Sequence, residues 1–237
     1  MHGYFNSLTD FSSKGIDGFE HIKRHILNEN DTNVDVFIHS WDLINQKQII
    51  DLYNPVKCIF EELKDFNTII KERNLNTLSN TPRPPNSVLA HLYGVSQSIK
   101  LAYDVGVNYD IVIKSRFDVG RINRNTSGPG LGNPYPVQCM NFTINIEPQR
   151  IYMADWNHLH MGPADMWFYG DYNTMKHFIG LYESLLNNFY IGGEFHQFAT
   201  NIEGNSGDLS NAIAFYKYWM IKNNLWNQKK LLKTTWE

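Results

Sequence analysis

The chain has 237 residues, a formal net charge of −3 and a hydrophobic share of 42%, which together predict one globular α/β domain with a sizeable core. Acidic and basic residues are mixed along the sequence, so the basic stripe that a phosphate backbone requires is missing and we expect no nucleic-acid partner. No apolar run approaches the roughly 20 residues that cross a bilayer. The first residues also lack the pattern of a signal peptide, and we therefore expect a soluble, cytoplasmic protein with no transmembrane segment.

The first quarter of the chain is predicted to alternate helices with strands. Apolar residues recur at helical spacing over 16–28, and 34–39 is a β-branched and aromatic run that is typical of a buried strand. A short helix over 43–53 and a second strand over 56–60 follow, on either side of Pro55.

The middle of the chain contains the clearest elements. A polar loop with three prolines covers 74–85, and the apolar positions of 86–103 form one face of an amphipathic helix. The run over 109–114 is the strongest strand signal in the sequence. The Gly-, Pro- and Asn-rich span over 121–136 is too long for a simple turn and predicts a loop that covers a site.

The last third combines short strands with helices. Strands are expected over 151–153 and 165–170, and helices over 172–187, from Glu194 onward, and over 209–222. The alternation in the first half implies parallel pairing with covered faces, whereas the loops between the later strands imply a mixed sheet.

Two predicted strands end in polar clusters, His39-Ser40-Trp41-Asp42 and Ser115-Arg116-Phe117-Asp118. Ligands of open α/β sheets bind outside the carboxyl ends of the strands. A carboxylate there binds a hard cation through oxygen, and a guanidinium offers paired donors to phosphate, so Arg116 and Asp118 suit a diphosphate with a divalent metal. An Arg–Asp ion pair that closes the strand end explains the same spacing, and spacing alone favours this second interpretation.

Three blocks in order, FIHSWD (37–42), IKSRFD (113–118) and DMWFYG (165–170), resemble glycosyltransferases of the GT-A type. The likeness is to sugar transferases of capsule and lipopolysaccharide gene clusters and of large DNA viruses. It implies a single Rossmann-like domain over 1–237, with a mixed, mainly parallel central sheet flanked by helices. Residues 1–120 would then bind a nucleotide sugar and residues 121–237 an acceptor. If the protein is viral, the host cytoplasm is the expected location.

The resemblance also implies roles for individual residues of the donor half. The positions that would bind the donor are Gly3, Tyr4, Phe5, His39, Trp41, Asp42, Arg83, Asn86 and Arg116. The first strand looks clipped, because only Met1 precedes His2-Gly3-Tyr4-Phe5. Either the start of the protein lies upstream, or this strand is unusually short.

A metal site is implied at Asp118, which stands where such enzymes carry the second Asp of their Asp-x-Asp motif. The first Asp is replaced by Arg116, so a single carboxylate would bind Mn²⁺ or Mg²⁺ with the diphosphate completing the ligands. His196 is a further candidate ligand. Alternatively, Lys114 and Arg116 neutralise the leaving group without a metal.

Two carboxylates are candidates for the proton acceptor that an inverting transfer to a glycan or glycolipid hydroxyl requires. Asp165 stands where the resemblance places an acceptor-side carboxylate, and Glu194 begins a predicted helix after two glycines. The helix dipole alone also favours a Glu in a first turn, which is the structural interpretation of Glu194.

Two other functions stay open from the sequence. The missing first Asp is compatible with a non-catalytic carbohydrate-binding protein on a decayed transferase fold. A nucleotidyltransferase or pyrophosphohydrolase would use the same donor half without an acceptor. The sequence has no Gly-x-Ser-x-Gly elbow, no Gly-x-Gly-x-x-Gly and no Walker loop, and Cys58 and Cys139 form no metal-ligand pattern.

Overall fold

The computed structural model describes residues 1–3, 14–28, 33–75, 84–120, 140, 142–203 and 207–233. The loop predicted over 121–136, most of the one predicted over 74–85, and Cys139 lie outside these residues.

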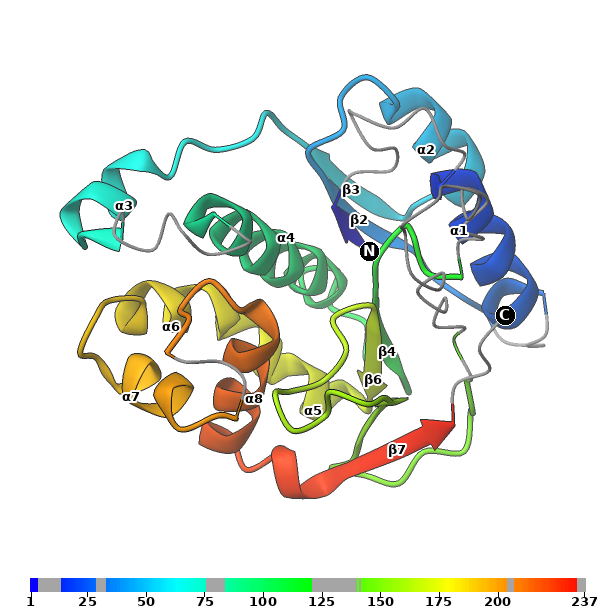
Figure 1. Cartoon of the computed structure of the whole chain (residues 1–237). Coiled ribbons are helices and arrows are strands. Elements are labelled where there is room, and N and C mark those ends of the chain that lie inside the picture. The colour runs from blue at the N-terminus through cyan, green and yellow to red at the C-terminus, as the bar shows by residue number, and fades with distance from the viewer. Residues whose placement is uncertain are drawn as a thin grey trace, which may run out of the picture.

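The strands form two small sheets (Figure 1). The first is parallel, in the order β1-β2-β3, with β1 at His2–Gly3, β2 at Phe37–Ser40 and β3 at Lys57–Phe60. The second has the order β4-β6-β5-β7, with β4 at Val112–Ser115, β5 at Ile151–Asp155, β6 at Trp167–Gly170 and β7 at Lys229–Lys233. In this second sheet β6 is antiparallel to both β4 and β5, and β7 is parallel to β5.

One residue connects the two sheets. His2 of β1 lies opposite His39 of β2 and also forms a parallel bridge with Arg116, just after β4. The strand β1 therefore lies between β2 and β4, and β6 is the one described strand that runs against the others. The expected mixed α/β class is confirmed, but the strands form two small sheets joined by a bridge where one central sheet was expected.

The helices follow the periodicity of the sequence closely. In chain order they are α1 (Lys14–Ile22), η1 (Lys23–Leu27), α2 (Gln46–Tyr53), α3 (Asn67–Glu72), α4 (Pro85–Tyr103), α5 (Tyr172–Lys176), η3 (His177–Gly180), α6 (Leu181–Asn188), α7 (Glu194–Thr200), α8 (Ala212–Lys222) and η4 (Trp226–Gln228). The single helix predicted over 172–187 is divided into α5, η3 and α6. Neither α3 nor β7 was predicted from the sequence.

The core lies on both faces of the second sheet, because successive strand side chains point to opposite faces. Phe168 and Met153 pack with α4 and the helices α5 to α8, whereas Trp167, Tyr169 and Tyr152 pack with α1, η1 and α2. Figure 1 shows the same division, with α4 to α8 grouped on one side of the strands and α1 and α2 on the other.

The helix α4 fixes the carboxyl ends of the first sheet. Pro85 at its first position suits a helix start, since proline lacks the N–H that the first turn leaves unpaired. Gly94 lets α4 approach β1 and β2, because a Cβ at this position would lie 3.2 Å from Nδ1 of His39 and 3.6 Å from Cβ of His2. None of the described helices has the length and apolar character that a membrane crossing requires.

Candidate functional site

The carboxyl ends of three parallel strands meet at one edge of the molecule. The registers that pair His2 with both His39 and Arg116 place Gly3, Ser40 and the residues after Ser115 side by side. This is the edge at which open α/β sheets bind their ligands.

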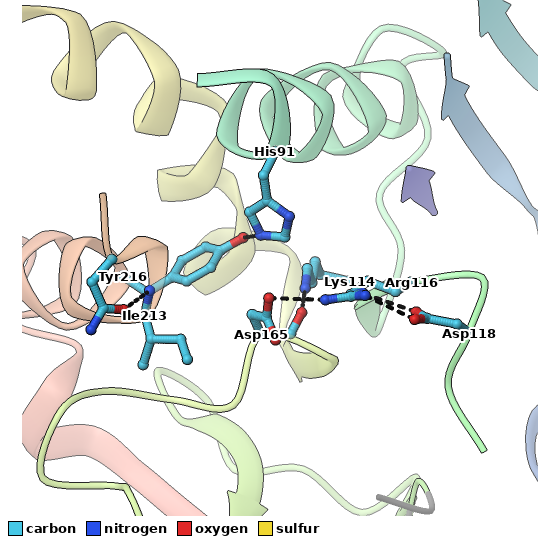
Figure 2. Close-up of polar contacts among 8 residues, drawn as sticks. His91, Lys114, Arg116, Asp118, Asp165, Ile213 and Tyr216 are labelled. Atoms are coloured by element: carbon cyan, nitrogen blue, oxygen red, sulfur yellow. Dashed lines mark hydrogen bonds and ion pairs between the residues drawn. The ribbon is translucent and has the colours of Figure 1, made fainter. Parts of the chain in front are cut away.

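Arg116 lies between two carboxylates at this edge (Figure 2). Its Nε and Nη2 atoms donate to Oδ1 and Oδ2 of Asp118 at 2.9 and 2.8 Å, and its Nη1 donates to Oδ2 of Asp165 at 3.0 Å. Burial lowers the pKa of Arg116, but Asp165 and Asp118 outweigh this effect and raise it. The side chains of Arg116, Asp118 and Asp165 are 31%, 17% and 20% exposed, so the cluster reaches solvent.

Antiparallel pairing between β4 and β6 brings Asp165 to this place. Ser115 lies opposite Trp167, and the backbone N–H of Arg116 donates to the carbonyl of Met166 at 3.1 Å. Asp165 is therefore held beside Arg116, although 49 positions separate the two residues in the sequence.

Lys114 is the second cation of the cluster, and it is almost wholly buried. Its Nζ donates to the backbone carbonyl of Asp165 and lies 5.3 and 5.7 Å from the ring centres of Phe168 and Tyr216. Burial lowers the pKa of Lys114 to about 7, while the Asp165 charge acts in the opposite direction. Lys114 therefore changes its charge near neutral pH.

Three further polar side chains line the wall behind Lys114. His91 of α4 contacts the hydroxyl of Tyr216 of α8 through Nε2 at 2.9 Å, as Figure 2 shows. The ring of His2 lies edge-on to that of His91 at 4.9 Å, and its buried Nε2 has no hydrogen-bond partner in the part of the chain that the structure describes. Burial and the neighbouring Lys114 keep the pKa of His2 well below its usual value.

The residues expected to bind the donor after β2 are buried. His39 contacts Oε1 of Glu61 through Nε2 at 2.8 Å, and burial lowers its pKa against the opposing effect of Glu61. Oδ1 of Asp42 accepts hydrogen bonds from the backbone N and from Nδ2 of Asn45 at 3.1 and 3.0 Å. These contacts hold the loop after β2, so the geometry gives His39 and Asp42 positioning roles at this edge.

Trp41, the remaining residue of this group, stacks on Tyr93 of α4 with ring centres 5.5 Å apart. Trp41 itself is buried, whereas Tyr93 is half-buried and lies 4.0 Å below Nζ of Lys64. The structure thus presents an aromatic surface with a cation beside it, contributed more by Tyr93 than by Trp41.

The other predicted donor residues lie around the start of α4 and the end of β1. Gly3 ends β1, and Asn86 lies in the first turn of α4 with its buried Oδ1 lacking a partner among the described residues. Buried polar atoms are normally hydrogen-bonded, so a ligand or a water would satisfy this oxygen. Tyr4, Phe5 and Arg83 lie outside the described residues.

The structure does not bring Glu194 or His196 to the Arg116 cluster. Glu194 accepts from the Tyr218 hydroxyl at 2.9 Å and pairs with Lys222, contacts that hold its pKa below the usual value. Both Glu194 and His196 belong to α7, which lies beyond α8 as seen from β4 in Figure 1.

The expected metal site consists of a single carboxylate, Asp118, with His196 as a further candidate ligand. Among the described residues, no three His, Cys, Asp or Glu side chains are grouped as a metal site requires. Both oxygens of Asp118 accept from Arg116, and Arg116 also pairs with Asp165. These residues do not fit a protein-held cation site, so Mn²⁺ or Mg²⁺ bound through Asp118 and a diphosphate stays a prediction from the sequence.

The helix α1 supports the loop that carries Arg116 and Asp118. A Cβ on Gly18 would lie 1.7 Å from the carbonyl oxygen of Phe117, so only glycine allows α1 to lie this close. On the same side, a Cβ on Gly120, which has a φ of +73°, would overlap the ring of His21. This support, and the roles of His2, His91 and Tyr216 behind Lys114, were not predicted from the sequence, because they arise from contacts between distant segments.

Comparisons of the sequence and the fold with protein-family models, with curated proteins and with solved structures give no match. The observations that bear on the function are therefore the geometry of the site and the resemblance of the three sequence blocks.

Proposed function

We propose that this chain is a glycosyltransferase that moves a sugar from a nucleoside-diphosphate sugar to a hydroxyl of a glycan or glycolipid. One observation carries the proposal. Arg116, Asp118 and Asp165 meet at the edge where the parallel strands β1, β2 and β4 end, the edge that binds ligands in sheets of this kind. The strand order β3-β2-β1-β4-β6-β5-β7, joined at His2, is compatible with the single Rossmann-like unit that the resemblance implies.

The leaving diphosphate is the group that Arg116 would stabilise. A guanidinium has five N–H donors, and three hydrogen bonds engage Arg116 with the two carboxylates, so two donors have no partner among these carboxylates in the described part of the chain and could bind phosphate oxygens. Stabilising charge that develops on a leaving group is the main electrostatic contribution to such a transfer. Lys114 adds a second positive charge behind Arg116 when it is protonated. The arrangement therefore supports the alternative in which Lys114 and Arg116 neutralise the leaving group.

Asp165 is the carboxylate that we assign to the acceptor hydroxyl. Its Oδ2 is held by Arg116, and its backbone carbonyl by Lys114, so the side chain has a fixed orientation at the edge of the site. A general base must lie within hydrogen-bond distance of the proton that it accepts, so the proposal requires the acceptor hydroxyl to bind beside the fixed carboxylate of Asp165. If the reaction inverts, Asp165 would accept the proton as the acceptor oxygen forms its bond to the sugar.

A thermal-shift screen with UDP-, GDP-, CDP- and dTDP-sugars, with Mn²⁺ and with EDTA, tests the proposal. We expect stabilisation by one nucleotide family and loss of that stabilisation in Arg116→Gln. The matched control is Arg150→Gln, which removes an arginine that is also ion-paired, to Glu147 at 3.2 Å, but precedes the amino end of β5, away from the carboxyl ends of β1, β2 and β4. A shift that persists in EDTA supports neutralisation by Lys114 and Arg116, and one that requires Mn²⁺ supports the metal at Asp118.

A carbohydrate-binding protein without transferase activity is the second candidate, because both carboxylate oxygens of Asp118 accept from Arg116. It predicts glycan binding that is independent of nucleotide. No shift with any nucleotide sugar, combined with retention on a glycan array, would favour this function and contradict the transferase.

A further inference from the structure

A cavity of about 600 Å³ lies between β2 and β4 and reaches Lys114 of the cluster described above. Its long walls are residues 33–37, which lead into β2, and 107–115, which lead into and include β4. Because the three strands are parallel, this cavity lies toward their amino ends, whereas Arg116 marks the carboxyl ends.

The backbone of β2 points peptide groups into the cavity. The carbonyl of Val36 accepts from the N–H of Val56 at 2.9 Å, so the peptide groups of Val36 face β3. Successive residues of a parallel strand direct their N–H and C=O groups to opposite sides. Asp35 and Phe37 therefore direct theirs away from β3, toward the cavity.

The strand β4, on the other side of the cavity, also directs peptide groups into it. Arg116 N–H donates to the carbonyl of Met166 on the β6 side, so by alternation Ile111, Ile113 and Ser115 direct their peptide groups toward the cavity. Among the described residues, only Met1 and the two-residue strand β1 pair with β2 and β4 on these sides, and the amino group of Met1 donates to the carbonyl of Phe37 at 2.5 Å.

We propose that this cavity is the seat of an extended, apolar peptide segment that continues β1 in the amino-terminal direction and is joined to Met1. The segment would pair in parallel with both β2 and β4 and would convert the two small sheets into one. The space has the right width, because His2 bridges both strands at the end of the cavity, which sets them two strand spacings apart, about 10 Å.

The cavity is long enough for four added residues that keep the register of β1. Since His2 lies opposite His39 and Arg116, Met1 lies opposite Ile38 and Ser115, and the carbonyl of Met1 accepts from the N–H of His39 at 3.0 Å. Counting back one residue at a time, the first added residue falls opposite position 37 of β2 and 114 of β4. The fourth falls opposite positions 34 and 111, which both line the cavity, and the two walls continue from there to Asn33 and Val107.

The two remaining walls determine the chemistry of the segment. Ile99 and Ala102 of α4 line one face of the cavity, and Ile22 and Ile26 line the other. Because alternate side chains of a strand point to opposite faces, all four added residues would meet apolar walls. The occupant that fits is therefore a run of β-branched apolar residues, as in a strand buried on both faces.

Four-residue extensions placed ahead of Met1, each behind the same initiating methionine, test the proposal. The test extension is Ile-Val-Ile-Val. The first control, Ser-Gly-Ser-Gly, has the same length without apolar side chains, and the second, Ile-Pro-Ile-Pro, retains apolar side chains but lacks two N–H donors. The readouts are the melting temperature and hydrogen exchange at the amides of Asp35, Phe37 and Ile113.

We expect Ile-Val-Ile-Val to raise the melting temperature by about 4 °C or more and to slow exchange at these amides at least roughly tenfold. Neither control should do both. Strand addition would be contradicted if the Ser-Gly-Ser-Gly extension had the same effects as Ile-Val-Ile-Val. It would also be contradicted if Ile-Pro-Ile-Pro stabilised the protein as much as Ile-Val-Ile-Val without protecting the amides. If a free Ile-Val-Ile-Val peptide at micromolar concentration protected these amides equally, the cavity would be a binding site for a separate chain, and the proposed continuation of β1 would be overturned. None of these readouts depends on transferase activity.

Discussion

Arg116 donates two hydrogen bonds to Asp118, from Nε to Oδ1 at 2.9 Å and from Nη2 to Oδ2 at 2.8 Å, although a single residue separates them in the sequence. A guanidinium thus occupies the position at which the resembling enzymes carry the first carboxylate of a metal-binding pair. With Lys114 protonated, the cluster contains two positive and two negative side chains. An incoming diphosphate therefore meets donors that are already held in position by four side chains whose charges sum to zero.

Replacing Arg116 with lysine should weaken nucleotide binding while preserving the charge. Lysine cannot reproduce the paired donors toward Asp118 or reach Asp165 and phosphate from the same planar group. Hydrogen bonds to charged groups contribute about 1.5–3 kcal/mol each, so we expect Kd for the nucleotide to rise at least roughly tenfold by calorimetry.

A double-mutant cycle separates this binding role from a structural role of the ion pair. The variants are Arg116→Gln, Asp118→Asn and the double substitution, each measured for unfolding in urea and for nucleotide affinity. A structural ion pair gives coupling in the free energy of unfolding alone. A site that holds Arg116 ready for phosphate also gives coupling in the free energy of binding, and the absence of that second coupling would remove Asp118 from the donor site.

The substitution Asp165→Asn should reduce turnover much more than donor affinity. The amide is nearly the same size and still accepts from Arg116 through its oxygen, but it no longer accepts a proton. General base catalysis contributes about 10²–10⁴-fold, so release of nucleoside diphosphate in the presence of acceptor should fall by a factor in this range, while Kd changes less than about threefold.

The matched control for this loss is Asp51→Asn, which neutralises an exposed carboxylate that pairs with Lys47 on the surface of α2. Its turnover should equal that of the wild type, since exposed pairs of this kind contribute little. If Asp165→Asn instead loses donor affinity with unchanged turnover, the carboxylate belongs to the donor subsite and the acceptor base lies elsewhere.

The support of the site by α1 predicts an unusual sensitivity at Gly18. A methyl group there would lie 1.7 Å from the carbonyl oxygen of Phe117, so in Gly18→Ala either α1 or the loop with Arg116 must move. Overpacking of this kind costs about 1–3 kcal/mol, and we expect lower stability together with weaker nucleotide binding. Gly180→Ala is the control, because its nearest neighbour is Trp219 at 3.7 Å, and it should retain both properties.

Much of the fold was predictable because its helices and strands carry strong local patterns. The helix α4 at Pro85–Tyr103 has a full apolar face, and it lies almost where its periodicity placed it. By contrast, β7 at Lys229–Lys233 alternates weakly and forms because β5 offers an edge, which is a long-range effect that no local pattern encodes.

The residues of the site were predictable where a charged side chain lies directly before or after a clear strand signal. Arg116 and Asp118 follow a strong strand signal, and Asp165 precedes the strand that pairs with it, so these three residues were identified and do come together. Glu194 was identified on its position at a helix start, but the structure pairs it with Lys222. His91 was missed, because its contact with Tyr216 joins helices that lie 125 positions apart.

Lys114 predicts a specific dependence of stability on pH. Burial lowers its pKa in the folded protein to about 7, whereas an unfolded lysine titrates near pH 10.4. Between these pH values the unfolded chain binds more protons, so the contribution of Lys114 to the free energy of unfolding rises with pH and is least favourable below pH 7. In Lys114→Met this slope should disappear, and the stability difference between variant and wild type should change by roughly 2–3 kcal/mol between pH 7 and 9, measured by urea unfolding. A difference that stays constant over this range would mean that the pKa of Lys114 is not lowered in the folded protein.

The same titration connects stability with the proposed reaction. A diphosphate bound at Arg116 favours the charged form of Lys114, so binding near pH 8 should take up a fraction of a proton. Calorimetry in buffers of different ionisation enthalpy measures this uptake directly, and Lys114→Met should abolish it while binding the nucleotide more weakly. Uptake that is identical in the variant would assign the proton to another group, and the positive charge behind Arg116 would then have no part in holding the leaving diphosphate.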